Sequence, residues 1–228
     1  MNRRARAEEL ESDSVSFAHE LDGRARALPY RAGRTLALIS HMKPLYILTQ
    51  PVSPHDHARG PETAPITLVE YGDYESTECR LAYLILADVL HEAGDRVRFV
   101  FRNFPMSDQH PHAMAAAEAA ESVAARGGDD AFWNMHDLLF ENQDALQHDD
   151  LIEYAAESGV DPIAVADDLA TSARRERVQR DIRTGTRSGV RHTPTFFVNG
   201  RHFEGDWTEP GALSDALQDG TRGHSYTH

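Results

Sequence analysis

Cysteine is almost absent from the sequence, which contains one, Cys79, in 228 residues. An intramolecular disulfide needs two sulfurs, and a thiolate zinc cluster needs several. The single cysteine therefore excludes both. It also excludes a redox cycle that alternates between a dithiol and a disulfide within this chain.

Long apolar runs are missing as well. The most apolar stretch, TLALISHMKPLYILT, is interrupted by His41, Lys43 and Pro44, and it is shorter than the ~20 residues that span a bilayer. The opening residues, MNRRARAEELESDS, begin with basic residues, but acidic residues follow and the apolar segment of a signal peptide does not. We therefore expect a cytoplasmic protein without membrane insertion.

Basic residues are scarce beside acidic ones: 23 against 37, for a formal net charge of −14. The excess of acid falls on the residues after 65. A body with this charge repels phosphate backbones and anionic membrane surfaces, so we expect no nucleic-acid partner. Hydrophobic residues make up 40% of the chain, which is typical of a globular protein.

The first ordered elements follow residue 65. Residues 66–71 (ITLVEY) form a short β-branched and aromatic run that predicts a strand. Residues 76–93 carry apolar side chains at helical spacing and stop at Gly94. Residues 96–105 alternate charged with apolar side chains, which predicts a half-buried strand. Together they predict a strand–helix–strand unit.

Helices dominate the next segment. Residues 109–188 follow a helical pattern, with Asp149 and Asp161 as the expected N-caps. Residues 193–203 then predict a β-hairpin with an Asn-Gly turn, and residues 210–218 predict a terminal helix. This order of elements predicts an α/β fold with an inserted helical domain.

Several strings in this sequence are those of one family. They are LVEYGDYE followed by Cys79 and Arg80, then VRFVFRNFP, HPHA, FWNMHDLLFENQDAL and TPTFFVNG. Together they resemble the DsbA-like thioredoxin-fold proteins, especially the bacterial cytoplasmic branch that is also found fused to sodium/proton antiporters. The resemblance implies a thioredoxin-like fold with a helical domain inserted between its two parts.

The resemblance also divides the chain. It implies an N-terminal extension at 1–56, a first thioredoxin-like part at 57–108, the inserted helical domain at 109–188, a second thioredoxin-like part at 189–219 and a tail at 220–228. Met42 is a candidate start of the protein, because the recognisable body begins shortly after it.

The resemblance places the family's Cys-x-x-Cys motif on Ser76-Thr77-Glu78-Cys79. The attacking cysteine is then replaced by Ser76, and Cys79 is the resolving one. A thiol at a helix start is stabilised as a thiolate by free N–H groups and the helix dipole, whereas a serine hydroxyl is a far weaker acid. Thr193-Pro194 is the expected cis-proline pair, which offers its backbone to the substrate.

Three functions stay open at this stage. Cys79 is a candidate for monothiol chemistry, as a mixed disulfide with glutathione, another low-molecular thiol or a protein partner. Alternatively, the fold is a non-catalytic module that binds a peptide or a partner. The third possible function is glutathione-dependent chemistry, in which Ser76 holds a glutathione thiolate as in kappa-class transferases and related isomerases. The corresponding structural interpretations make Ser76 a helix cap and Cys79 a buried, inert side chain.

The histidines suggest fewer roles. The run His55-Asp56-His57 has metal-binding residue types, but it lies in a proline-rich stretch without a third rigid ligand, so we interpret it as a solvated loop and expect no metal. His110 and His112 are expected to cap or pack, with proton transfer near Cys79 as the alternative. We expect His136 to be half-buried in a helix.

Overall fold

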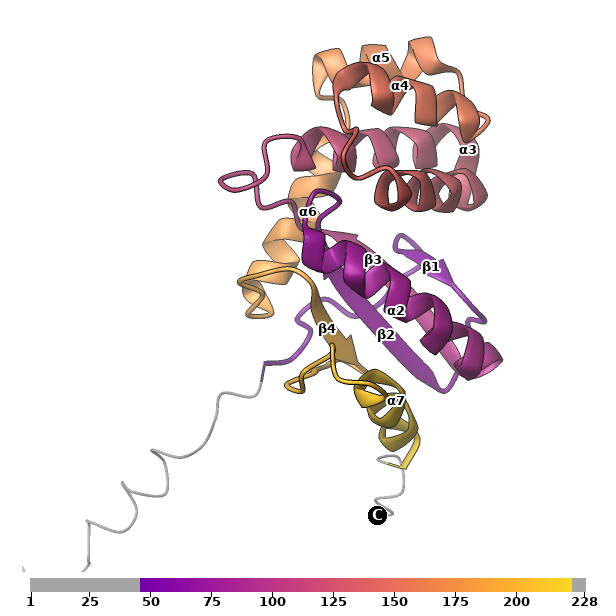
Figure 1. The fold of residues 1–228 in the computed structure, drawn as a ribbon, viewed down its shortest axis with the longest axis vertical. Helices are drawn as coiled ribbons and strands as arrows, with labels where there is room; N and C mark the ends of the chain where they lie inside the picture. The colour runs from indigo at the N-terminus through magenta and orange to yellow at the C-terminus, as the bar shows by residue number, and fades with distance from the viewer. Residues whose placement is uncertain (1–45, 223–228) are drawn as a thin grey trace, which may run out of the picture. The chain divides into compact units, whose positions relative to one another are not determined.

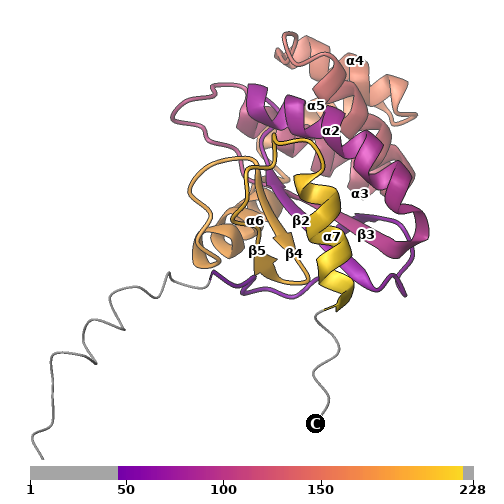
Figure 2. The same cartoon turned by 60° about the horizontal axis from the view of Figure 1, so that its bottom comes forward.

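A five-stranded sheet is the centre of the fold in the computed structural model, which describes residues 46–222. Its spatial order is β1-β3-β2-β4-β5, in which β2 and β3 are parallel and the other neighbours are antiparallel. Figure 2 shows β4 beside β2, with β5 on the outer side of β4. The strands are β1 (His57–Arg59), β2 (Ile66–Gly72), β3 (Val97–Asn103), β4 (Thr195–Val198) and β5 (Arg201–His202).

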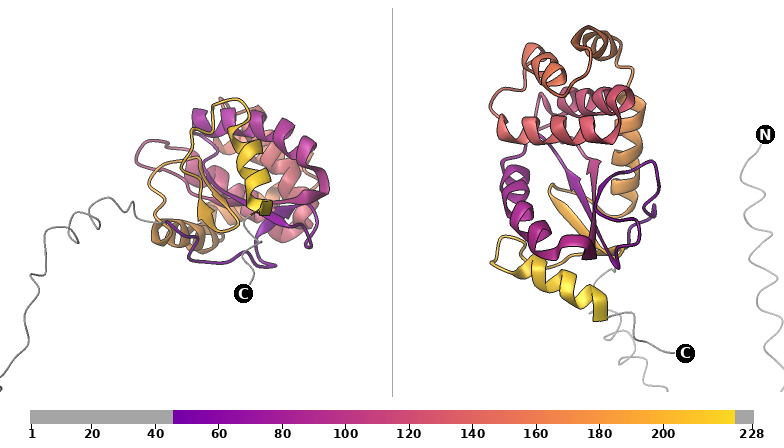
Figure 3. Two further views of the ribbon diagram at one scale, coloured as in Figure 1. Left: turned by 90° about the horizontal axis from the view of Figure 1, so that it is seen from below. Right: turned by 90° about the vertical axis from the view of Figure 1, so that its right-hand side faces the viewer.

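Helices cover both faces of the sheet. Helices α2 and α7 pack on one face and α6 on the other (Figure 3), while α3, α4 and α5 lie together beyond one end of the sheet (Figure 1). The predicted α/β fold with an inserted helical region is therefore confirmed. The helices are α2 (Thr77–Ala93), η1 (Gly94–Arg96), α3 (Ala113–Glu141), α4 (His148–Glu157), α5 (Pro162–Thr171), α6 (Arg175–Arg187) and α7 (Ala212–Arg222).

Two apolar cores form, one on each face of the sheet. Ile66 and Leu68 of β2 point to the core beneath α2, which continues into the inserted helices. Val69 and Tyr71 of the same strand point to the smaller core beneath α6. This alternation is what the two-residue period of a strand dictates. Because α2 begins directly after β2, the start of α2 lies at the end of the sheet that faces the insertion.

Strand β3 is buried on both faces, so the prediction of a half-buried strand is wrong. Arg102, which suggested a solvent-facing side, is only 1% exposed. Its guanidinium lies 2.8 Å from Asp56, and it donates to the carbonyls of Gln50 and Pro51 at 3.0 and 3.3 Å and to the Tyr71 hydroxyl at 2.9 Å. The residues before β1 thus cover this face of β3.

Residues 46–56, which fall within the predicted extension, contact the sheet. The Leu48 N–H donates to the Gly200 carbonyl at 2.8 Å, and the His202 N–H donates to the Tyr46 carbonyl at 3.0 Å. The segment therefore pairs with β5, and Leu48 is buried in the smaller core. Met42 and the rest of the extension lie outside the described residues.

The helix caps differ in part from those predicted. Asp161 caps α5 by accepting from the Ile163 N–H at 3.1 Å, as predicted. Asp149 does not cap α4, because that helix begins at His148 and its N-cap is Gln147. The Gln147 side chain accepts from the backbone N–H of Asp150, whose carboxylate accepts from the Gln147 N–H at 2.9 Å.

The helices that the structure describes in residues 46–222 include none with the length and apolar character of a membrane span.

Candidate functional site

The site begins where the loop after β2 turns into α2. Ser76 is the N-cap of α2, and its Oγ accepts a hydrogen bond from the Cys79 N–H at 3.3 Å. The Ser76 hydroxyl donates in turn to the Glu78 carboxylate at 3.2 Å. An N-cap side chain satisfies one of the free N–H groups at a helix start. The prediction that Ser76 caps this helix is confirmed.

Cys79 lies one turn into α2 and has no exposed surface. Burial, with a contribution from the charge of Glu70, raises the pKa of the Cys79 thiol far above its ordinary value. The Asp73 N–H, which donates to Sγ at 3.4 Å, and the Ser76 and Thr193 hydroxyls act in the opposite direction but do not outweigh burial. The thiol is therefore protonated and shielded, as the structural interpretation predicted.

Thr193 and Pro194 lie opposite the start of α2, in the loop between α6 and β4. The peptide bond between them is cis. Pro194 is buried, while Thr193 is half-buried and reaches the Cys79 sulfur. The structure thus brings Ser76 and Cys79 together with Thr193 and Pro194, although the two pairs are more than a hundred residues apart in the chain.

A pocket of about 510 Å³ lies between these two loops. Its lining is mostly polar, with the exposed acid Glu78 on one side and the exposed Arg191 and His192 on the other. Cys79 does not line it. The residues that define its two sides are Ser76, Glu78, His110, Thr193, Pro194 and Trp207.

Asp73 holds one wall of this pocket in place. Its buried carboxylate accepts from the Met106 N–H at 2.7 Å and from the Glu75 N–H at 2.8 Å, and one of its oxygens lies 2.8 Å from His110 Nδ1. His110 therefore lines the pocket with its ring fixed by Asp73. His112 does not line it, and its ring nitrogen lies 3.0 Å from the Gln147 amide.

His136 lies away from the pocket, in the aromatic core beneath α3. It is 3% exposed, so the prediction that it is half-buried is wrong. Its Nδ1 lies 3.2 Å from the Tyr74 hydroxyl, and burial lowers the pKa of its imidazole well below the ordinary value. A neutral, enclosed ring of this kind is a packing residue.

Glu70 is a residue of the site that the sequence analysis missed. It lies on the face of β2 that carries Ile66 and Leu68, beneath α2, and it is 2% exposed. Its Oε1 has no hydrogen-bond partner within the described residues, and burial raises the pKa of its carboxyl to about 8. An acid within a strand whose other residues are apolar, apart from Thr67, was the available signal.

The run His55-Asp56-His57 is not a solvated loop throughout, contrary to that interpretation. Asp56 pairs with Arg102, and His57 stacks on Phe132 at 3.6 Å between ring centroids. His57 also lies 3.1 Å from the Glu121 carboxylate. Within residues 46–222, no group of three or more His, Cys, Asp or Glu side chains is arranged to hold a metal ion.

A family model described as thioredoxin matches residues 52–219. Among curated proteins, the chain is 41% identical over 194 residues to a Na⁺/H⁺ antiporter NhaA of Salinispora tropica, covering 85% of this chain and 29% of the relative. It is 42% identical over 179 residues to an NhaA antiporter of Herminiimonas arsenicoxydans, covering 77% and 28%. The chain thus spans less than a third of the length of these relatives.

Solved structures show the same fold. Oxidised BdbD of Bacillus subtilis matches with a TM-score of 0.69 and 24% identity, covering 78% of this chain and 98% of that one. A thioredoxin-like oxidoreductase of Silicibacter pomeroyi matches with a TM-score of 0.62 and 22% identity, covering 77% and 95%. The thiol-disulfide exchange protein α-DsbA2 of Wolbachia pipientis matches with a TM-score of 0.62 and 15% identity, covering 73% and 88%. The chain belongs to the thioredoxin family, and its structural neighbours are DsbA-like.

Proposed function

We propose that this chain is a DsbA-like domain that binds an extended peptide in the pocket between Ser76 and the Thr193–Pro194 loop, without two-thiol turnover. The observation that carries the proposal is the arrangement of the site. A serine caps the helix at the pocket, and the one cysteine, Cys79, lies buried beneath it. The frame of a thiol-disulfide oxidoreductase is thus combined with a pocket that exposes no thiol.

In this proposal Ser76 does not act as a nucleophile in the way that the family's attacking cysteine does. Helix-dipole stabilisation of up to ~2 kcal/mol lowers a pKa by only about one to two units, and a serine hydroxyl needs far more to ionise near neutral pH. Ser76 also donates to the Glu78 carboxylate, which would repel an anion formed at its oxygen. The same carboxylate weighs against glutathione-dependent transferase or isomerase chemistry, in which Ser76 would hold a thiolate.

Monothiol chemistry at Cys79 is the second candidate, because the Ser76 and Thr193 hydroxyls both reach its sulfur. The Cys79 thiolate would attack a disulfide, form a mixed disulfide and release the other sulfur as a thiolate. Since Cys79 is fully buried and protonated, this step requires the start of α2 to open. We therefore expect little mixed disulfide between Cys79 and glutathione after incubation with oxidised glutathione, which an intact-mass measurement detects directly.

The cytoplasmic location stays a prediction.

Peptide binding is tested with a fluorescein-labelled decapeptide that is neutral and carries one central S-methylcysteine. Its anisotropy should rise on titration with the full chain. Thr77→Trp should weaken binding about tenfold, because Thr77 lines the pocket, whereas Ala87→Trp on the exposed side of α2 should not. Absence of binding at millimolar protein, or equal weakening by the two variants, would overturn the proposal.

A further inference from the structure

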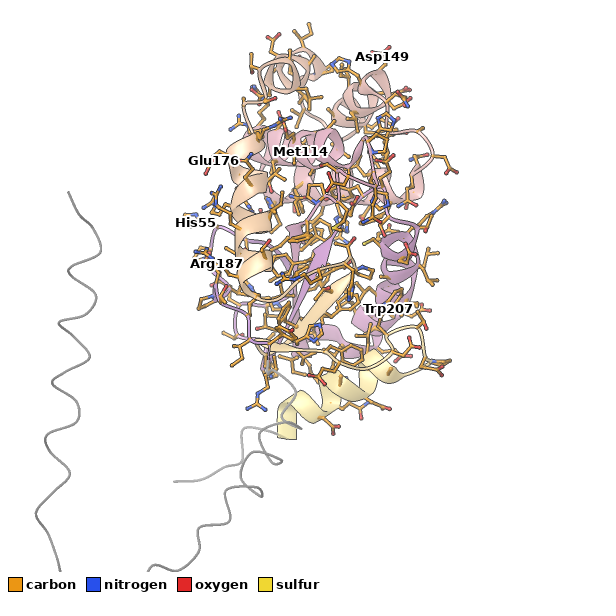
Figure 4. All side chains as sticks on the ribbon, turned by 90° about the vertical axis from the view of Figure 1, so that its left-hand side faces the viewer. His55, Met114, Asp149, Glu176, Arg187 and Trp207 are labelled. Carbon is orange, nitrogen blue, oxygen red and sulfur yellow. The ribbon has the colours of Figure 1, made fainter. Side chains whose placement is uncertain are left out.

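A second pocket adjoins the first on the other side of Pro194. It has a volume of about 290 Å³ and shares His192, Pro194 and Trp207 with the larger pocket. Its outer wall is the loop that connects β5 to α7. We call it the acidic pocket. Figure 4 shows Trp207 on this loop, at the opposite end of the domain from Asp149 of α4.

Aromatic rings and carboxylates together line the acidic pocket. Phe203 and Trp207 are half-buried at its wall, and Trp207 packs edge-on against Phe196 at 6.1 Å between ring centroids. Glu204 and Asp206 are both exposed on the same loop and line the same pocket. Aromatic faces beside carboxylates attract a cation, by ring quadrupole and by charge.

Asp206 is held in place with its charge. Its Oδ1 accepts from the Thr208 hydroxyl at 2.6 Å and from the Thr208 N–H at 3.0 Å. These hydrogen bonds lower the pKa of the Asp206 carboxyl, which is ionised at neutral pH as an ordinary aspartate is. The loop therefore presents a fixed carboxylate next to Trp207, and burial keeps the pKa of the neighbouring His202 below its ordinary value.

We propose that the acidic pocket takes an arginine or lysine side chain of the peptide that binds along the Thr193–Pro194 loop. This inference rests on the proposed function and names its substrate class as a basic peptide. The two pockets share Pro194 and Trp207, so one extended chain occupies both. An arginine is favoured over a lysine, because its planar guanidinium stacks on the Trp207 ring while it pairs with a carboxylate.

The overall charge of the chain fits such a partner. With 37 acidic against 23 basic residues, the protein attracts basic peptides from a distance. That long-range attraction does not depend on where the peptide binds. A test of one specific pocket therefore needs a control in which acidic residues elsewhere on the protein are changed. Asp149 and Glu153 are exposed acids of α4 that serve this purpose. Figure 4 shows Asp149 of this helix far from Trp207.

The experiment compares three labelled peptides that differ only at the residue beside the S-methylcysteine, which is Arg, Gln or Glu. We expect the Arg peptide to bind the full chain about tenfold more tightly than the Gln peptide, and the Glu peptide to bind most weakly. In the double variant Glu204→Gln/Asp206→Asn the Arg-to-Gln ratio should fall to about one. Asparagine at 206 keeps an oxygen for Thr208.

The double variant Asp149→Asn/Glu153→Gln is the matched control, since it removes the same charge from α4. It should keep the tenfold ratio. If the Arg and Gln peptides bind equally to the unmodified chain, or if the ratio persists without Glu204 and Asp206, the acidic pocket is not the determinant and the inference fails while the proposed function stands. If none of the peptides binds, the proposed function fails as well.

Discussion

At the scale of single residues, the site is defined by which groups are shielded from water. Cys79 and Glu70 lie together at the start of α2. Burial raises the pKa of the thiol, and Glu70 adds to this effect once it is ionised. The Ser76 hydroxyl oxygen accepts a hydrogen bond from the Cys79 N–H at the start of α2. The chemically capable groups are therefore enclosed, and the exposed residues of the pocket are suited to binding.

Glu70 makes the stability of the fold depend on pH. Its pKa is about 8 in the folded chain against an ordinary 4.5, so folding takes up a proton between these values. The free energy of unfolding should therefore fall as pH rises from 4.5 through 8, by roughly 3–5 kcal/mol from this group. Below pH 4.5 the penalty vanishes, because the carboxyl is protonated in both states.

Glu70→Gln should remove this contribution. Denaturant unfolding gives the free energy of unfolding of the variant and of the unmodified chain at pH 5 and at pH 8.5. The contribution of Glu70 is the amount by which their difference changes between the two pH values. We expect the variant to gain stability relative to the unmodified chain at pH 8.5. Glu92→Gln, an exposed change on the same side of the sheet, is the control. An equal difference at the two pH values would contradict the buried, uncharged carboxyl.

At the scale of elements, the pairing of Asp56 with Arg102 fixes the segment before β1 to β3. Both side chains are less than a tenth exposed. Removing one member of a buried pair leaves the other charge without compensation, which costs roughly 3–5 kcal/mol. We therefore expect Asp56→Ala to lower the free energy of unfolding by about 3 kcal/mol.

The control for Asp56→Ala is Glu176→Ala. Glu176 pairs with Arg183 at 2.6 Å on the exposed face of α6, and exposed pairs contribute about 0–1 kcal/mol. Urea unfolding monitored by circular dichroism compares the two variants. Similar small losses in both would show that residues 50–56 do not stabilise the domain.

Local pattern was sufficient for most elements and for the cap on α2. The run ITLVEY, the helical spacing up to Gly94 and the hairpin turn all depend on neighbouring residues, and so does the role of Ser76. Arg102 and His57 were misjudged because the groups that cover them, Asp56 and Glu121, come from elsewhere in the chain. The acidic pocket was missed for the same reason, since it forms only where the Thr193–Pro194 loop meets the loop that connects β5 to α7.

At the scale of the whole molecule, the chain has the thioredoxin-like fold with one cysteine at the start of α2. Our proposal places Ser76 at the position of the family's attacking cysteine, so Ser76→Cys should complete a Cys-x-x-Cys pair, because Ser76 is the N-cap of α2 and Cys79 lies in its first turn. We expect the unmodified chain to show no turnover in an insulin-reduction assay and the variant to show measurable turnover. A variant that stays fully reduced under mild oxidant would contradict the placement of Ser76 at the attacking position.

The enclosed sulfur of Cys79 gives the protein an internal reporter of local opening. A thiol reagent labels a buried cysteine only during the fraction of time that its surroundings unfold, so the labelling rate reports the free energy of that fluctuation. Ser76 and Thr193 both reach the sulfur and both line the pocket. A peptide that stabilises the closed pocket should slow the labelling of Cys79 in proportion to its occupancy, which measures affinity with no probe attached to either partner.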